Sequence, residues 1–138
     1  MNDAELAVRL RTILGRLGRR IRQHAPQSLT AGQISTLAGL EAIGPVRLGD
    51  LADYEGVSAP TQSRIVASLQ AHRFIDRTPD PDDGRAFLLA ISAQGGARLA
   101  HLREERSAFL TERIAALPSE QRAALLAALP ALEALAEP

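Results

Sequence analysis

The sequence predicts a mainly α-helical chain with a small β-wing, in which a winged helix-turn-helix core is flanked by N- and C-terminal helices. Three observations support this fold class. Apolar residues recur at helical spacing over most of the chain, a glycine turn separates two short helices near Gly56, and two apolar runs enclose turn-forming residues at 79–84. With 138 residues and 46% hydrophobic content, the chain has the size of one domain with a buried core.

The first two helices are predicted by an apolar stripe and by a start signal. The stripe of the first helix consists of Leu6, Leu10, Ile13, Leu17 and Ile21, with arginines on the other faces. The second helix is expected to begin after Thr30, because Thr30 and Gln33 have the spacing of a capping box. It is expected to end at Gly44–Pro45.

The segment around Gly56 predicts a helix-turn-helix. A short helix ends near Tyr54, and Gly56 lies where the chain must reverse, since glycine adopts positive φ at little cost. Ser58 is a favourable N-cap for the next helix, and Pro60 falls in its first turn, where a missing N–H is harmless.

The polar face of this next helix is expected to read bases in the major groove. Ile65, Val66 and Leu69 predict the core-facing stripe. The residues left on or beside the opposite face are Thr61, Gln62, Ser63 and Arg64. Arginine can donate two hydrogen bonds to guanine, glutamine can pair with adenine, and hydroxyls serve bases or phosphates. Taken alone the face is consistent with solvated surface, but the neighbouring turn, cap and wing favour DNA reading.

Two strands at 74–78 and 86–91 are predicted to form the wing, because both runs are rich in apolar and β-forming residues. Arg85 lies just beyond the tip, where a guanidinium suits the narrow minor groove. Asp83 would suit a phosphate-facing tip only if it pairs with an arginine. The alternative is a tip selected for turn propensity, with Arg85 solvated.

Two helices are predicted after the wing. Ser92 should cap a long helix, and Pro118–Ser119 separates it from a last one, in which Pro130 should kink or split the leucine pattern. A chain this small has little core left against which these apolar stripes could pack. We therefore expect them to pack against a partner subunit. An intrachain helical bundle is the alternative. We therefore expect dimerisation helices at 1–28 and 93–138 around a winged-helix module at 29–92.

Composition argues against several other classes of protein. The net charge of +0 predicts only modest nonspecific attraction to phosphates. There is no cysteine, and the spacing of His24, His72 and His101 does not suggest a metal site. We found no catalytic motif, signal peptide or apolar run of membrane-spanning length. We expect a cytoplasmic protein that is not an enzyme and has no cofactor or metal.

Four segments together resemble the successive signatures of MarR-type transcriptional regulators. They are Leu48-Gly49-Asp50-Leu51-Ala52, Val57-Ser58-Ala59-Pro60-Thr61-Gln62-Ser63-Arg64, Asp80-Pro81-Asp82-Asp83-Gly84-Arg85 and Ile91-Ser92-Ala93-Gln94-Gly95. The resemblance implies a homodimer on a palindromic operator, usually a repressor released by a small, often anionic aromatic ligand. It also implies close packing between the wing and the next helix at Gly95–Gly96.

The resemblance implies DNA contacts by Pro60, Thr61, Gln62, Ser63 and Arg64 and by Asp83 and Arg85, and we add Ser58 and Arg77 to this set. Gly84 departs from the family pattern, which often has arginine there, so phosphate contact at the tip should be weaker. An effector pocket is expected at the junction of the dimerisation and wing modules, lined by Leu10, Leu14, Arg16, Leu17 and Leu37. The alternative function is a winged-helix protein-interaction module without DNA binding, which the zero net charge and Gly84 would both allow.

Overall fold

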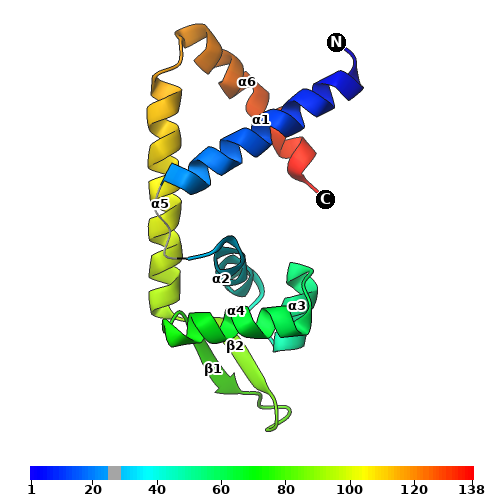
Figure 1. Cartoon of the computed structure of the whole chain (residues 1–138), viewed down its shortest axis with the longest axis vertical. Coiled ribbons are helices and arrows are strands. Elements are labelled where there is room, and N and C mark those ends of the chain that lie inside the picture. The colour runs from blue at the N-terminus through cyan, green and yellow to red at the C-terminus, as the bar shows by residue number, and fades with distance from the viewer. Residues whose placement is uncertain (25–28) are drawn as a thin grey trace. The chain divides into compact units, whose positions relative to one another are not determined.

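The structure is a computed structural model that describes residues 1–24 and 29–138 (Figure 1). The elements in chain order are α1 (Asp3–His24), α2 (Ala31–Ile43), α3 (Leu48–Glu55), α4 (Ala59–Ala71), β1 (Ile75–Pro79), β2 (Phe87–Ile91), α5 (Ala93–Ala115) and α6 (Ser119–Ala136). This order confirms the predicted class, which is mainly α-helical with a winged helix-turn-helix. Both predicted strands lie within one residue of the observed ones.

The chain divides into two compact units. The central unit is Pro26–Glu104, and the terminal unit combines Met1–Ala25 with Glu105–Pro138. The expected boundary after residue 28 falls outside the described residues. The expected boundary before residue 93 differs from the division of the structure, because the first turns of α5 belong to the central unit. Leu99 and Leu102 of these turns are almost fully buried.

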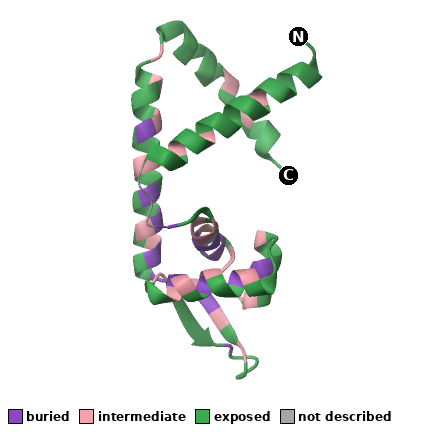
Figure 2. Ribbon diagram, viewed as in Figure 1, coloured by how far each residue is buried: buried purple, intermediate pink, exposed green. Residues whose placement is uncertain are grey.

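The core of the central unit takes apolar side chains from all its helices and from the hairpin (Figure 2). Its buried members are Leu29, Leu37, Leu40, Leu51, Val66, Leu69, Ile75, Leu89 and Leu99. Burying a side chain of this size contributes about 1.5–3 kcal/mol. These contacts hold α3, α4 and the hairpin against α2, so the unit has a core of its own.

The predicted start and stop signals of the central helices are confirmed. Thr30 and Gln33 form the capping box of α2, and Gly44 is the C-cap of this helix. Gly56 has a φ of 68° at the end of α3, and its N–H donates to the carbonyls of Ala52 and Asp53. The Ser58 hydroxyl accepts a hydrogen bond from the Thr61 N–H and caps α4. Local hydrogen bonds therefore specify the helix-turn-helix.

The wing is an antiparallel hairpin in which Ile75 pairs with Ile91 and Pro79 with Phe87. Val46, just before α3, joins β2 through two backbone hydrogen bonds with Leu89, of 3.0 and 2.8 Å. This bridge connects the wing directly to the start of the helix-turn-helix. The wing therefore does not rely on its own two strands alone.

The terminal unit is much more exposed than the central one (Figure 2). Neither α1 nor α6 contains a buried residue among those described. Helix α6 continues through Pro130 as one helix, so the predicted split does not occur. The carbonyl of Leu126 loses its usual donor there, but Leu126 is 70% exposed and water can reach this turn. Within the described residues no helix has both the length and the apolar character needed to cross a membrane.

Candidate nucleic-acid interface

The first turn of α4 presents part of the predicted DNA-contacting set at the surface. Pro60, Ser63 and Arg64 are exposed. Thr61 is half-buried, and its hydroxyl oxygen accepts a hydrogen bond of 2.9 Å from the Ser58 hydroxyl. Both hydroxyls therefore take part in the helix cap. Ser63 and Arg64 remain the side chains of this turn with free reach toward a groove.

The prediction that Gln62 faces the groove is wrong. Its side chain is fully buried, and its Nε2 donates a hydrogen bond of 2.9 Å to Oγ1 of Thr36 on α2. Gln62 shares its helix face with the buried Val66 and Leu69, at positions i, i+4 and i+7. The helical position of Gln62 thus indicated burial, whereas its polar side chain suggested exposure.

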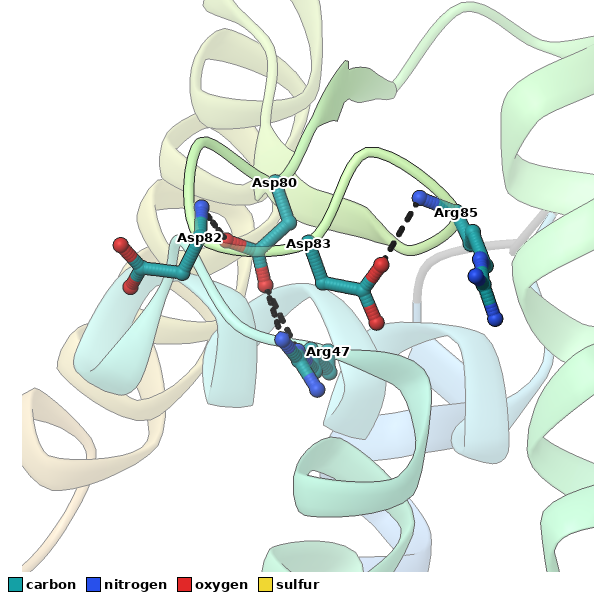
Figure 3. A network of polar contacts seen from close by, with 5 residues as sticks. All are labelled: Arg47, Asp80, Asp82, Asp83 and Arg85. Atoms are coloured by element: carbon teal, nitrogen blue, oxygen red, sulfur yellow. Dashed lines mark hydrogen bonds and ion pairs between the residues drawn. The ribbon is translucent and has the colours of Figure 1, made fainter.

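The wing contributes three exposed residues of the predicted set: Arg77, Asp83 and Arg85. The guanidinium of Arg77 lies 3.9 Å from the centroid of the Phe87 ring, a cation–π arrangement that holds it against the hairpin. The carboxylate of Asp83 accepts a hydrogen bond of 3.0 Å from the backbone nitrogen of Arg85 (Figure 3). Asp83 therefore shapes the backbone of the tip, whereas another acid of the tip pairs with an arginine side chain.

That acid is Asp80, which pairs with Arg47 just before α3 (Figure 3). One carboxylate oxygen of Asp80 accepts from Nε of Arg47 at 2.7 Å and from Nη2 at 2.6 Å. The other accepts from the backbone nitrogen of Asp82 at 2.9 Å. Asp80 is only 6% exposed. The pair therefore joins the base of the wing tip to the helix-turn-helix, beside the Val46–Leu89 bridge.

These contacts favour the charged form of both partners. The backbone hydrogen bond from Asp82 and the side-chain hydrogen bond from Arg47 lower the pKa of Asp80 below its ordinary value, against the opposing effect of burial. The hydrogen bond and the charge of Asp80 raise the pKa of Arg47. The pair is therefore charged at neutral pH, and charge-assisted bonds with two donors also fix direction.

A groove of about 460 Å³ lies between the start of α3, the outer face of α4 and the wing. Its polar lining consists of Arg47, Ser63, Gln70, Arg77 and Arg85. The start of α3 and the wing, which are distant in sequence, thus bring the guanidiniums of Arg47, Arg77 and Arg85 to one concave surface beside the exposed turn of α4. Such a surface can donate hydrogen bonds to phosphate oxygens, while Ser63 and Arg64 are placed at the adjoining helix.

Comparison with known proteins agrees with this geometry. The MarR family model matches residues 29–87. An HTH-type transcriptional regulator of Mycobacterium bovis is 36% identical over 137 residues, which cover 99% of this chain and 96% of the relative. The chain belongs to the MarR family of transcriptional regulators.

Solved structures of this class have the same fold as the MarR-family chain. A putative transcriptional regulator from Pseudomonas aeruginosa superposes with a TM-score of 0.86 at 28% identity, over 98% of this chain and 96% of that one. A mutant of S. aureus MepR, solved bound to an oligodeoxyribonucleotide, superposes with a TM-score of 0.68 at 21% identity, over 96% and 98%. At that identity the second likeness concerns the fold alone.

The residues expected to line an effector pocket in this MarR-family chain fall in both units. Leu37 is fully buried in the core of the central unit. In the terminal unit Leu14, Arg16 and Leu17 are exposed, and Leu10 is half-buried. Arg16 lines a shallow cavity with Arg19, Arg20 and Gln23. The pocket formed by all five residues stays a prediction.

Two residues of the interface could not be found from the sequence. Arg47 and Asp80 are 33 positions apart, and no local pattern pairs one with the other among 16 basic and 16 acidic residues. The Asp-Pro dipeptide at 80–81 is typical of turns, and neither this property nor the family signature that contains it indicates a partner for Asp80. Only the fold reveals that the carboxylate points back toward α3.

Proposed function

We propose that this transcriptional regulator is a homodimeric repressor, that it binds a palindromic operator, and that a small ligand releases it. One observation carries the DNA-binding part of the proposal. Ser63 of α4 and Arg77 and Arg85 of the wing line one groove, next to the exposed Arg64. In this proposal α4 enters the major groove, and the wing arginines contact the backbone and the adjacent minor groove.

The charges of the central unit bear on how it would bind DNA. Residues 26–104 contain seven arginines and nine carboxylates, a formal net charge of −2. Long-range attraction to DNA is therefore weak, and affinity depends on the local placement of arginines. The Asp80–Arg47 pair removes one of these carboxylates from competition with phosphates. The proposal predicts a modest nonspecific affinity and a large ratio of specific to nonspecific binding.

The homodimer is supported by the exposed apolar surface of the terminal unit. Large apolar side chains of α1 and α6 are exposed by between 37% and 71%, namely Leu6, Val8, Ile13, Leu14, Leu17, Leu125, Leu126, Leu129 and Leu135. An apolar surface of this extent is costly in water unless a partner covers it. A second copy of the chain would do so, and its two-fold symmetry would place two recognition helices on a palindrome.

The ligand is proposed to be an aromatic anion. The terminal unit contains a cavity of about 410 Å³ lined by Arg20, Gln23, His24, Phe109 and Arg113. The rings of His24 and Phe109 lie 4.4 Å apart between centroids, and Arg113 lies 5.0 Å from the Phe109 centroid. Such a lining offers charge for a carboxylate and aromatic surface for a ring. Titration of the full chain with benzoate, with Arg113→Ala as the variant, tests this part.

Selection from random double-stranded DNA with the full-length chain tests the operator proposal. We expect a palindromic site, bound more weakly as salt concentration rises. Arg64→Ala should lower the free-energy preference for that site by about 1–3 kcal/mol if the guanidinium contacts a base edge. Fluorescence anisotropy with operator and scrambled duplexes measures this preference.

Arg103→Ala is the matched control for the loss of one positive charge. Arg103 belongs to the same unit but pairs with Glu41 of α2 at 2.7 Å, away from the groove. We expect this variant to keep the operator preference. Selection that enriches no site would refute the proposal and support a winged-helix module that binds other proteins.

A further inference from the structure

Two side-chain hydrogen bonds tie α4 to α2 in the central unit. Nε2 of Gln33 donates to Oγ of Ser68 at 2.8 Å, near the C-terminal half of α4. Nε2 of Gln62 donates to Oγ1 of Thr36 at 2.9 Å, in the turn that carries Ser63 and Arg64. The first bond is partly exposed, whereas the second is buried. The N-terminal end of α4 is thus attached to the core by a directional polar contact.

Stability does not explain this buried pair. Gln62 and Thr36 are 0% and 1% exposed, and Oε1 of Gln62 has no hydrogen-bond partner among the residues that the structure describes. Because a hydroxyl can donate or accept, either end of the amide could face Thr36, and the other end would still be unpaired. A buried polar atom without a partner destabilises the folded state. An apolar side chain of similar volume would fill the same space without this cost.

The hydrogen bond between Gln62 and Thr36 can fix the rotation of α4 about its own axis, which apolar packing cannot do. Apolar contacts tolerate small rotations of a helix about its own axis, whereas a hydrogen bond weakens steeply when its angle changes. Gln62 precedes Ser63 and Arg64 directly, so a rotation at Gln62 changes the direction of both. Side chains that read base edges need a defined direction, because bidentate contacts depend on geometry.

We propose that Gln62 is a positioning residue for operator recognition: its hydrogen bond to Thr36 sets the rotation of the first turn of α4. The inference rests on the proposed function, since it concerns how the same helix, α4, is oriented toward DNA. Gln62 itself contacts no base. Its effect passes through Ser63 and Arg64, which it holds in one orientation relative to the core.

The decisive variant replaces both partners by apolar side chains of similar size, Thr36→Val with Gln62→Met. It removes the unpaired amide oxygen, so its Tm should equal or exceed that of the wild type. The ratio of operator affinity to scrambled-duplex affinity should fall about tenfold, the size of one weakened base contact. Affinity for the scrambled duplex should stay unchanged. A double variant with the wild-type ratio would overturn the inference.

Two single variants at position 36 keep the inference testable if the double variant does not fold. Thr36→Ser retains the hydroxyl but loses a buried methyl group, so it should lower the Tm and keep the operator preference. Thr36→Val retains the volume but loses the hydroxyl, and it should lose the preference. A merely structural role predicts that the preference follows the Tm in both variants, which would contradict the inference.

A measurement without DNA separates this inference from the proposed function. In ¹⁵N spectra of the DNA-free full chain, the amides of residues 61–64 should shift and broaden in Thr36→Val and much less in Thr36→Ser. Equal spectra for the two variants would overturn the inference whether or not the chain binds an operator. If the spectra differ as expected but selection enriches no DNA site, the proposed function fails and the positioning contact stands.

Discussion

Leu40 of α2 and Leu126 of α6 both belong to apolar stripes of helices, yet Leu40 is 1% exposed and Leu126 is 70% exposed. The difference holds for their whole units. Among the described residues, Phe109 is the one buried apolar residue of the terminal unit, whereas the central unit buries a continuous cluster. The comparison shows that the same sequence pattern can supply a buried core or an exposed apolar surface.

The charges of the two units differ as well. The terminal unit has nine arginines against seven carboxylates, while the central unit has the opposite imbalance. Zero net charge is therefore a sum over two unlike parts. The part proposed to bind DNA is the acidic one, and it relies on where its arginines lie.

The largest effect is expected from a charge on the exposed apolar face of α6. If this face is the contact surface of the proposed homodimer, Leu126→Glu should raise the dimer dissociation constant by more than about 100-fold, since a buried unpaired charge costs about 3–5 kcal/mol. Sedimentation velocity over a range of concentrations measures it. Gln121→Glu adds the same charge to α6 at another exposed position and should leave the dimer intact. An unchanged dimer in Leu126→Glu would mean that this face is not the contact surface.

Truncation of one leucine in each unit tests the comparison directly. Leu40→Ala should lower the free energy of unfolding by about 2–5 kcal/mol at any protein concentration, because it leaves a cavity in a closed core. Leu14→Ala should lower the Tm mainly at low protein concentration, where the proposed dimer dissociates. Thermal unfolding of both variants at several protein concentrations distinguishes these two kinds of loss. A concentration-independent loss in Leu14→Ala would show that the terminal unit buries this side chain by itself.

Two adjacent glycines at the start of α5 provide a matched pair. A Cβ at Gly95 would overlap the carbonyl oxygen of Phe74, whereas a Cβ at Gly96 would have no atom of a described residue within 4 Å. Gly95→Ala should therefore lower the free energy of unfolding by about 1–3 kcal/mol. Gly96→Ala should raise it by up to about 1 kcal/mol, since alanine favours the helix. Equal results in chemical denaturation would contradict the close packing of the wing against α5.

The smallest effect concerns the Asp80–Arg47 pair and its dependence on pH. The folded state lowers the pKa of Asp80 below its ordinary value of 3.8, so the stabilisation is complete above that value and is lost as pH falls through the folded pKa. The wild type should have a higher free energy of unfolding than Asp80→Asn at pH 7. This difference in free energy should disappear below about pH 3.8. Asp82→Asn, at an exposed position of the tip, is the control. If the difference in free energy of unfolding stays constant down to pH 2, this ion pair is not its cause.

The sequence by itself determined the order of the elements and the places where helices begin and end. The capping box of Thr30 and Gln33, the turn at Gly56 and the caps at Ser58 and Ser92 depend on hydrogen bonds between residues a few positions apart. Such bonds form within one turn of chain, so the local residue types suffice to predict them. The resemblance to a known family also rested on short local segments, two of which contain Ser58 and Ser92.

Only the tertiary structure decided which polar residues face inward. Gln62 is buried because α2 brings Thr36 against that side of α4, and Asp80 is held because α3 begins beside the wing. The partners are 26 and 33 positions apart in sequence. A polar side chain shows by itself neither its partner nor its burial, since both depend on which surface the fold places opposite.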